Sequence, residues 1–395
     1  MILRGPGPRG DYDPCNNLKP ADYPSTARGT YGPLLSPIRT GRDQADLHER
    51  QRTLQVTRKR LARASSIDVA RLAGVSIAAV SRAFTSGSSI SEELAGKVHK
   101  AARQLKYVPN TLASSLITRE TNIVALMLAN LSNPIYSAML AEASRRLEEI
   151  GKQVLLFTPR DAQDFDQSLQ RMLRYQVDAI VITAASISSR MASLCLDRDV
   201  PVVMLGRHVP GLPVHSVRGN AREGGRLVAE LMLKGGGRRF GIIGGPTNLT
   251  TILERKDAVI ARLRQDIDVS GVGVCDGGLT YAGGYQAALK LMSSRNPPDS
   301  LVCLTDIMAL GAMDAIRFEL SRKIPEDVAI TGFDDIAEAG HASYRLSTVR
   351  TPVREMIDHM IALISRKPKN DEPKVIELKA ELIVRHTTRL LIETN

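Results

Sequence analysis

The stretch SSIDVARLAGVSIAAVSRAF, residues 65–84, carries the most specific pattern in the chain. Three of its positions have a clear mechanical reason. Ala70 lets two helices approach closely, Gly74 can take the positive φ of a tight turn, and Val80 fills the angle between the helices. The spacing of these residues predicts a helix-turn-helix, and an ordinary pair of antiparallel helices is the alternative interpretation.

Serines and apolar side chains around this stretch indicate where its helices begin and what they bury. Ser65 or Ser66 can cap the first helix, and Ser76 can cap the second. A third helix is expected from about Glu92. We therefore predict three short helices around one small core, to which the first would contribute Ile67, Ala70 and Ala73, and the third Leu94, Val98, Ala101 and Leu105.

The positive charge of the chain lies almost entirely in its first third. The net charge is +11, of which +10 belongs to residues 1–119 and +1 to residues 120–395. A basic N-terminal region next to a nearly neutral remainder indicates a polyanionic partner. Nucleic acid is favoured over a membrane surface because no amphipathic basic helix accompanies the charge. A solvated basic tail is the alternative, and composition alone does not decide between them.

Residues 1–63 account for +6 of this charge and are rich in Pro, Gly, Arg and Asp, without a sustained period of 2 or 3.6. We therefore expect them to be disordered. Because no Met occurs between Met1 and Met127, one hypothesis is that translation starts at a non-Met codon near Val56 and that residues 1–55 are an artefact of the gene model. N-terminal sequencing that recovered peptides from residues 1–50 would disprove it.

If the second helix enters a major groove, the residues at its start face base edges. Ile77, Ala78 and Ala79 lack amide or charged groups, so sequence preference would depend on thymine methyls and on Arg82. The DNA-contacting residues expected in this segment are Ser65, Ser66, Ser76, Ile77, Ala78, Ser81 and Arg82.

Beyond Thr121 the pattern changes to short apolar runs that alternate with amphipathic helical stretches, such as 137–150, 221–234, 282–293 and 308–321. That alternation predicts parallel βαβ units and doubly wound sheets. Because about 275 residues are too many for one ordinary open sheet, we expect two α/β lobes with a ligand cleft between them. The expected strands are 122–129, 153–158, 179–185, 201–206, 240–245, 300–305 and 328–333.

Several other classes of protein are disfavoured. No apolar run approaches the length of a membrane span, and no secretion signal follows Met1, so we expect a cytoplasmic protein without a membrane partner. Four scattered cysteines and seven histidines form no metal, disulfide or nucleophile pattern, so we expect no enzyme, metal or cofactor. A solute-binding protein and an α/β enzyme remain as alternatives.

Two strings, SSIDVARLAGVSIAAVSRAF and LKYVPNTLASSL, resemble the headpiece and hinge of the LacI/GalR family of bacterial transcription regulators. The strings SNPIYSAML, VPVVMLGR, GGPTNLTTILER and IPEDVAITGFDD resemble the family's core, so the similarity spans about residues 65–388. It implies a homodimeric repressor that binds operator DNA, with a core resembling type I periplasmic binding proteins that binds a small effector. The expected parts are a headpiece at 64–109, a hinge at 110–120, and a core at 121–390 with lobe 1 at about 121–219 plus a return near 350–375 and lobe 2 at about 220–348.

The hinge is too short to form a stable helix alone. A helix of residues 110–117 lies below the roughly 12–15 residues at which isolated helices become marginal in water, so it should fold only when paired or bound. By similarity to the family, Leu116 is the apolar wedge that kinks the operator centre, with Asn110 and Ala113 against the backbone. The alternative is that Leu116 packs the linker onto the core.

Arg255 and Asp334 match the positions at which the family holds its effector. A guanidinium supplies a planar fork, and an aspartate accepts from two neighbouring hydroxyls, which suits sugars, sugar acids and similar polyols. The alternative is an ion pair at the surface or between the lobes. Further candidates implied by the resemblance are Ile135, Tyr136, Thr305 and Asp306, whereas Gly206-Arg207, Leu249 and Leu279 depart from the family's common residues.

Overall fold

The computed structural model divides the chain into two compact units, one on each side of the bond between Arg119 and Glu120, and each is described by itself. The residues that the structure describes are 64–85, 88–109, 120–128, 131–160, 162–183, 189–246, 249–365 and 372–389. The predictions for residues 1–63 and for the hinge residues 110–119 therefore concern residues outside the described ranges.

The headpiece, residues 64–109, forms the predicted helices α2 (Ser66–Ala73), α3 (Ile77–Ala83) and α4 (Glu92–Gln104). Each begins at a serine whose hydroxyl accepts a backbone N–H of the first turn. Between α2 and α3 the chain turns at Gly74, whose φ of 67° is the left-handed conformation that glycine adopts without strain. The buried core of the headpiece is Val69, Ala70, Val80, Val98, Ala101 and Ala102.

Two expectations about the headpiece core were wrong. Ile67 is 52% exposed, because it lies two residues before the buried Val69 and hence on the opposite side of α2. Ala79, expected to face base edges, is 3% exposed and lies beside the buried Val80. The exposed face of α3 therefore begins with Ile77 and Ala78 alone.

Gly96 offers a test of the helix that closes this core. It lies within α4, is exposed, and an added Cβ would meet nothing within 4 Å. Gly96→Ala should stabilise α4 by about 0.5–1 kcal/mol and slow amide exchange of its helix in the full chain, measured by mass spectrometry. The matched change Gly74→Ala should destabilise by about 1 kcal/mol, because Gly74 has a positive φ. Equal effects of the two changes would contradict this assignment.

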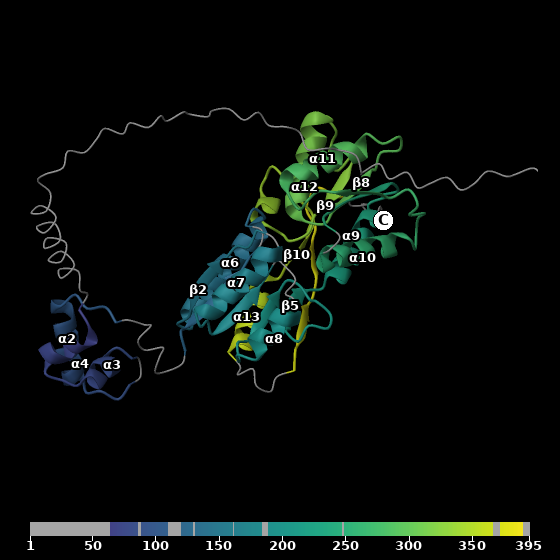
Figure 1. Ribbon diagram of the computed structural model, residues 1–395. Coiled ribbons are helices and arrows are strands. Elements are labelled where there is room, and N and C mark those ends of the chain that lie inside the picture. Colours follow the sequence, from purple (N-terminus) through teal and green to yellow (C-terminus); the bar gives the residue numbers. More distant parts are fainter. Residues whose placement is uncertain are drawn as a thin grey trace, which may run out of the picture. The chain divides into compact units, whose positions relative to one another are not determined.

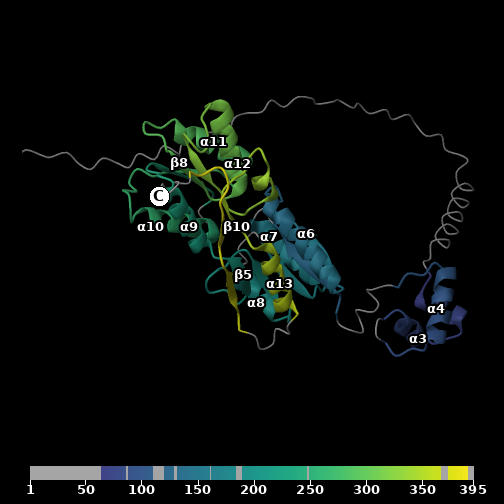
Figure 2. The ribbon, with the colours of Figure 1, turned by 180° about the vertical axis from the view of Figure 1, so that it is seen from behind.

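The second unit consists of two parallel sheets, each covered by helices (Figures 1 and 2), as the alternating pattern predicted. We name lobe 1 the part around the six-stranded sheet, whose order is β11-β5-β4-β3-β1-β2. Its strands are β1 (Ile123–Met127), β2 (Gln153–Phe157), β3 (Ala179–Ile182), β4 (Val202–Leu205), β5 (His215–Gly219) and β11 (Val375–Leu378). Its helices are α6 (Pro134–Glu149), α7 (Ala162–Arg174), α8 (Ser189–Leu196) and α13 (Val353–Ile364).

Lobe 2 surrounds the four-stranded sheet, whose order is β7-β6-β8-β9. Its strands are β6 (Phe240–Gly244), β7 (Gly273–Asp276), β8 (Ser300–Cys303) and β9 (Ala329–Thr331). Its helices are α9 (Ala221–Lys234), α10 (Thr250–Leu263), α11 (Tyr281–Met292), α12 (Asp306–Asp314), a π-helical turn (Ala315–Glu319) and a 3₁₀ turn (Ala337–Gly340).

The chain crosses between the lobes after β5, after β10 (Thr348–Arg350) and between β11 and β12 (Glu381–Ile383). Strands β10 and β12 pair antiparallel, and β10 lies between the lobes (Figure 1). After β10 the chain returns to lobe 1 and continues to strand β11. The residues that follow β12 lie against lobe 2, where the Ile330 N–H donates to the Thr387 carbonyl. None of the helices in the described ranges combines the length and apolar character that a bilayer span requires.

Candidate functional site

The outer face of α3 presents small, apolar and basic groups to solvent. Ser76, Ile77, Ala78, Ser81 and Arg82 are all exposed, and Ile77 leaves about half of its side chain accessible. The hydroxyl oxygen of Ser76 accepts the backbone N–H of Ala79 at 3.1 Å, which fixes the start of the helix. Such a face matches the dimensions and chemistry of a helix that enters a major groove.

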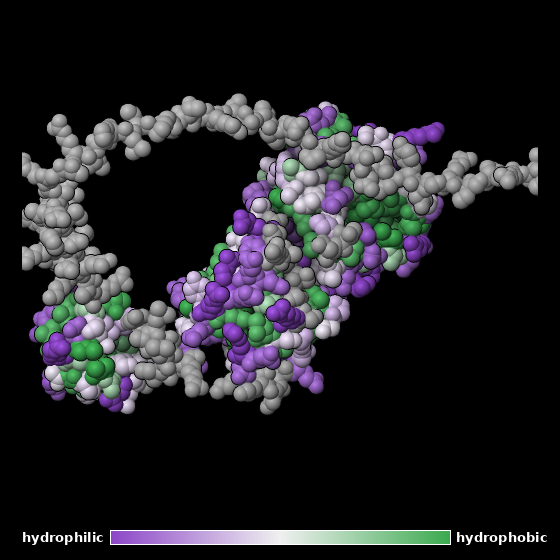
Figure 3. Space-filling view, viewed as in Figure 1, coloured by the Kyte–Doolittle hydropathy of each residue, from purple (hydrophilic) through white to green (hydrophobic). Residues whose placement is uncertain are grey.

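The two serines before α2 contribute differently. Ser65 is exposed and completes a capping box with Asp68, whose carboxylate accepts both the Ser65 hydroxyl at 2.7 Å and the Ser65 N–H at 3.0 Å. Ser66 is the first residue of α2 and is half-buried. The sequence left open which serine caps α2, and the structure assigns the cap to Ser65. Apolar and hydrophilic groups lie side by side on the headpiece surface (Figure 3).

A cavity between the lobes is lined at the carboxyl ends of the strands from both sheets. Of the residues predicted to bind an effector, Ile135, Tyr136, Arg255, Thr305 and Asp334 line it. The other lining residues that carry the argument below are Asn133, Arg207, Asn220, Leu249, Thr251, Leu279, Phe333, Arg350 and Thr351.

Arg255 and Asp334 form a buried ion pair within lobe 2, so both alternatives, a surface pair and a pair between the lobes, are wrong. Arg255 Nη2 lies 3.0 Å from Asp334 Oδ1, and its Nη1 donates to the Leu304 carbonyl at 2.7 Å. The guanidinium lies over the Phe333 ring, 4.5 Å from its centroid. The pair holds a guanidinium and a carboxylate side by side at the wall of the cavity.

The crossover strand positions Asp334. Its backbone N–H donates to Val349, its carbonyl accepts from Thr351, and the Thr351 hydroxyl donates to Oδ1 at 3.2 Å. Asp334 has a φ of 118°, a conformation that non-glycine residues rarely adopt and that surrounding contacts must stabilise. Burial raises the pKa of the Asp334 carboxyl above its usual value, and the Arg255 guanidinium opposes that rise.

Thr305 contributes a hydroxyl that lacks a partner. The residue is 4% exposed, it precedes α12, and its Oγ1 is bonded neither to the helix nor to any other described residue. An unsatisfied buried hydroxyl costs stability unless something completes its hydrogen bonds. At the wall of a cavity, that group is expected to be a ligand or water.

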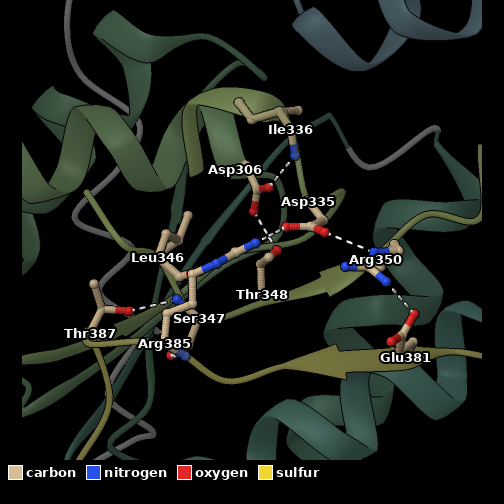
Figure 4. Close-up of polar contacts among 10 residues, drawn as sticks. All are labelled: Asp306, Asp335, Ile336, Leu346, Ser347, Thr348, Arg350, Glu381, Arg385 and Thr387. Atoms are coloured by element: carbon tan, nitrogen blue, oxygen red, sulfur yellow. Dashed lines mark hydrogen bonds and ion pairs between the residues drawn. The ribbon is translucent and has the colours of Figure 1, made fainter. Parts of the chain in front are cut away.

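Asp306 does not line the cavity, so its prediction as a ligand-binding residue was wrong. It is fully buried, and both of its carboxylate oxygens already accept hydrogen bonds (Figure 4). Oδ1 accepts from the Thr348 hydroxyl at 2.5 Å, and Oδ2 accepts from the Ile336 N–H at 2.9 Å. Through its hydrogen bond with Thr348, the first residue of β10, Asp306 joins lobe 2 to the crossover.

A neighbouring network ties the crossover strands together (Figure 4). The Asp335 carboxylate accepts from Arg350 Nε at 2.9 Å and from Arg385 Nη2 at 2.6 Å. Arg350 in β10 also donates to Glu381 in β12 at 2.7 Å. Although Arg350 lines the cavity, its charge is therefore compensated by two carboxylates.

Asp306 should make the stability of lobe 2 depend on pH. Burial, and next the Asp334 carboxylate, raise its pKa from 3.8 to about 7. The pKa of Asp306 is higher in the folded protein than in the unfolded chain, so binding of a proton stabilises the fold. This contribution is complete below pH 3.8 and is lost as the pH rises to about 7. Denaturant unfolding should show this decline in the wild type and a flatter profile for Asp306→Asn. Parallel profiles would contradict it.

Sequence reasoning missed several polar lining residues. Asn133 caps α6 by accepting the Ile135 N–H, and Asn220 caps α9 by accepting the Glu223 N–H. Thr251 in lobe 2 donates to the Gly206 carbonyl of lobe 1 at 3.1 Å. For Asn220 a signal was available, because an N-cap residue directly after a parallel strand lies at the ligand-binding edge of a sheet. Among the described residues, no group of His, Cys, Asp or Glu could hold a metal ion.

Comparisons with known proteins agree with this architecture. Residues 67–110 match the family of bacterial regulatory proteins named after lacI, and residues 212–388 match a periplasmic binding protein-like domain. The transcriptional regulator AscG of Escherichia coli is 33% identical over 304 residues, covering 75% of this chain and 89% of that protein. The regulator DegA of Bacillus subtilis is 30% identical over 333 residues, covering 81% of this chain and 97% of that protein.

Among solved structures, the complex of the transcriptional regulator CelR with cellobiose is similar, with a TM-score of 0.60 and 27% identity over 82% of this chain and the whole of that one. The chain belongs to the LacI family of bacterial transcription regulators.

Proposed function

We propose that this protein represses transcription by binding a pseudo-palindromic operator as a homodimer in the cytoplasm, and that a small polyol in the cleft between the lobes controls its affinity for DNA. The observation that carries the proposal is the combination of an exposed, basic α3 face with a cavity lined by the buried Arg255–Asp334 pair. The proposed function is binding, in keeping with the transcription regulators AscG and DegA to which the chain is similar.

On the operator, α3 lies in the major groove. Ile77 and Ala78 contact thymine methyls, while Ser76, Ser81 and Arg82 reach phosphates or nearby bases. The Arg82 guanidinium forms no ion pair with a described residue and is available to a DNA phosphate. Ser65 and Ser66, at the start of α2, lie near the sugar-phosphate backbone of the DNA. The excess charge of residues 64–119, +4, supports docking on a polyanion.

In the cleft, Asp334 accepts from neighbouring hydroxyls of the ligand, Thr305 completes its hydrogen bonds with another, and Tyr136 and Ile135 pack against the ring from lobe 1. Because ligand contacts come from both lobes, binding favours one arrangement of the lobes. DNA favours another, and each partner changes the affinity of the other by the same factor.

Operator binding tests the proposal. DNA fragments selected from random sequence by the purified protein should contain an inverted repeat, and fluorescence anisotropy should show dimeric binding whose affinity changes when sugars or sugar acids are added. A chain that selects no repeat, or whose DNA affinity stays constant across a broad panel of polyols, would disprove the corresponding half of the proposal.

The hinge forms a separate part of the proposal. Leu116 enters the minor groove at the operator centre and kinks it, with Asn110 and Ala113 against the backbone. Leu116→Ala should lower operator affinity by about tenfold and reduce DNA bending in a circular-permutation assay, because the unstacking wedge is lost. Full affinity with unbent DNA in the variant would show that Leu116 packs elsewhere.

A further inference from the structure

The wall of the cavity that belongs to lobe 1 carries a single charge among its described residues, the guanidinium of Arg207. Arg207 follows strand β4 and is half-buried. It forms no ion pair and no side-chain hydrogen bond with a described residue, whereas the other charged lining groups, Arg255, Asp334 and Arg350, are all paired. The cavity therefore contains one positive charge that the protein leaves uncompensated.

The backbone on both sides of this guanidinium is held firmly. The Gly206 N–H donates to the Val217 carbonyl at 2.7 Å, and the Gly206 carbonyl accepts from Thr251. The Arg207 carbonyl accepts the Ser216 hydroxyl, and the next carbonyl accepts from Thr250 at 3.3 Å. The backbone that carries Arg207 is therefore fixed at the cavity wall, while its guanidinium keeps donors that no described residue uses.

The opposite wall, in lobe 2, adds donors that also lack partners. Helices α10 and α12 both begin at the cavity, at Leu249 and Thr305, and neither has a side-chain cap on its first turn. The Thr305 hydroxyl is buried, unpaired and at the wall. Helices α6 of lobe 1 and α9 of lobe 2 also start at the cavity, and both are capped by asparagine. Lobe 2 thus offers hydrogen-bond donors and the positive ends of two helices to a ligand.

We propose that the effector is a polyol carrying a carboxylate, such as a uronate or an aldonate, whose carboxylate binds Arg207 and whose hydroxyls bind Asp334 and Thr305. This inference rests on the proposed function of the cleft and specifies its ligand class. The planar guanidinium fork matches a carboxylate in two parallel hydrogen bonds. A phosphate monoester is the competing anion, because helix N-termini also bind phosphate, so the test below includes a sugar phosphate.

Matched pairs of ligands test the inference. Isothermal titration of the full chain would compare glucose with glucuronate and gluconate, galactose with galacturonate and galactonate, and glucose 6-phosphate as the phosphate probe. We expect an acid from one of these series to bind about 10- to 100-fold more tightly than its neutral sugar, because a charge-assisted pair replaces a solvated hydroxyl. The same acid should change operator affinity.

Variants assign this preference to Arg207. Arg207→Gln should lower affinity for the acid about 10- to 100-fold and affinity for the neutral sugar by a much smaller factor, so that the preference for the acid is lost, and Arg207→Lys should retain part of the preference. Arg160→Gln, at a position 90% exposed and away from the cavity, is the charge-matched control and should bind like the wild type. Circular dichroism of each variant checks that the fold is retained.

Each other outcome has one meaning. Equal binding of acid and neutral sugar, an unaltered preference in Arg207→Gln, or tighter binding of glucose 6-phosphate would overturn the carboxylate assignment and leave the polyol-regulated repressor standing. No binding by any member of the panel would overturn both, and operator binding without a ligand response would then separate the DNA-binding half from the effector half.

Discussion

Replacing Arg255 with methionine should abolish the effector response and lower the free energy of unfolding of the core by about 3–5 kcal/mol. Methionine keeps much of the aliphatic volume over the Phe333 ring but leaves the Asp334 carboxylate buried without its cation, and the Leu304 carbonyl without a donor. Denaturant unfolding of the full chain, followed by circular dichroism, measures the loss of stability, and titration of operator binding with the effector measures the loss of response.

The double variant Arg255→Met with Asp334→Asn separates the two effects. Because the buried carboxylate is then neutralised, most of the stability should return, while the effector response should stay absent since both binding groups are gone. A single variant as stable as the wild type would show that the pair is solvated. A double variant that still responds to the effector would remove the pair from the binding site.

Ala78→Glu should lower operator affinity by about 100-fold or more while the headpiece stays folded, because it places a carboxylate at the exposed start of α3, where the phosphates and base edges of DNA would lie. Ala78 is exposed and contributes nothing to the headpiece core, so the fold has no reason to change. Anisotropy measured at several salt concentrations checks both the affinity and the number of phosphate contacts.

Gly96→Glu is the matched control for Ala78→Glu. It adds the same charge to an exposed position of α4 where an added Cβ meets nothing within 4 Å. Gly96→Glu should lower operator affinity by a factor at least ten times smaller than Ala78→Glu does, because it changes only the long-range electrostatic field at the DNA. Equal losses in the two variants would show that net charge rather than the α3 face governs DNA binding.

The expected strands coincide with β1, β2, β3, β4, β6, β8 and β9 because each lies in a continuous, mainly apolar run. All of them except β2, a partly exposed edge strand, are largely buried. The strands that were missed have another composition. Strand β5, HSVRG, is largely polar, and β11, VIEL, is a half-exposed edge, so their assignment depends on pairing with remote neighbours rather than on their own residues. The π-helical turn at Ala315–Glu319 likewise has no local signal.

At the candidate site, the sequence pointed to Arg255 and Asp334 but placed Asp306 beside them. Local spacing puts Thr305 and Asp306 equally close to the end of β8, yet the first hydroxyl faces the cavity and the next carboxylate faces the crossover strand. Which of two adjacent side chains faces a ligand depends on the direction in which the helix leaves the sheet. That direction is set by packing between elements far apart in the chain.

The sequence by itself determined the helix-turn-helix and its glycine turn, the α/β class of the core and the family, because these are encoded by neighbouring residues whose periodicity acts locally. The tertiary structure alone decided that Ser65 rather than Ser66 caps α2. It also decided that Arg207 and Thr305 have no side-chain partner among the described residues, and that Asp306 is enclosed. These latter properties arise where strand ends from both lobes meet, so the charge balance and burial of each group depend on residues up to about two hundred positions away, and no local pattern records them.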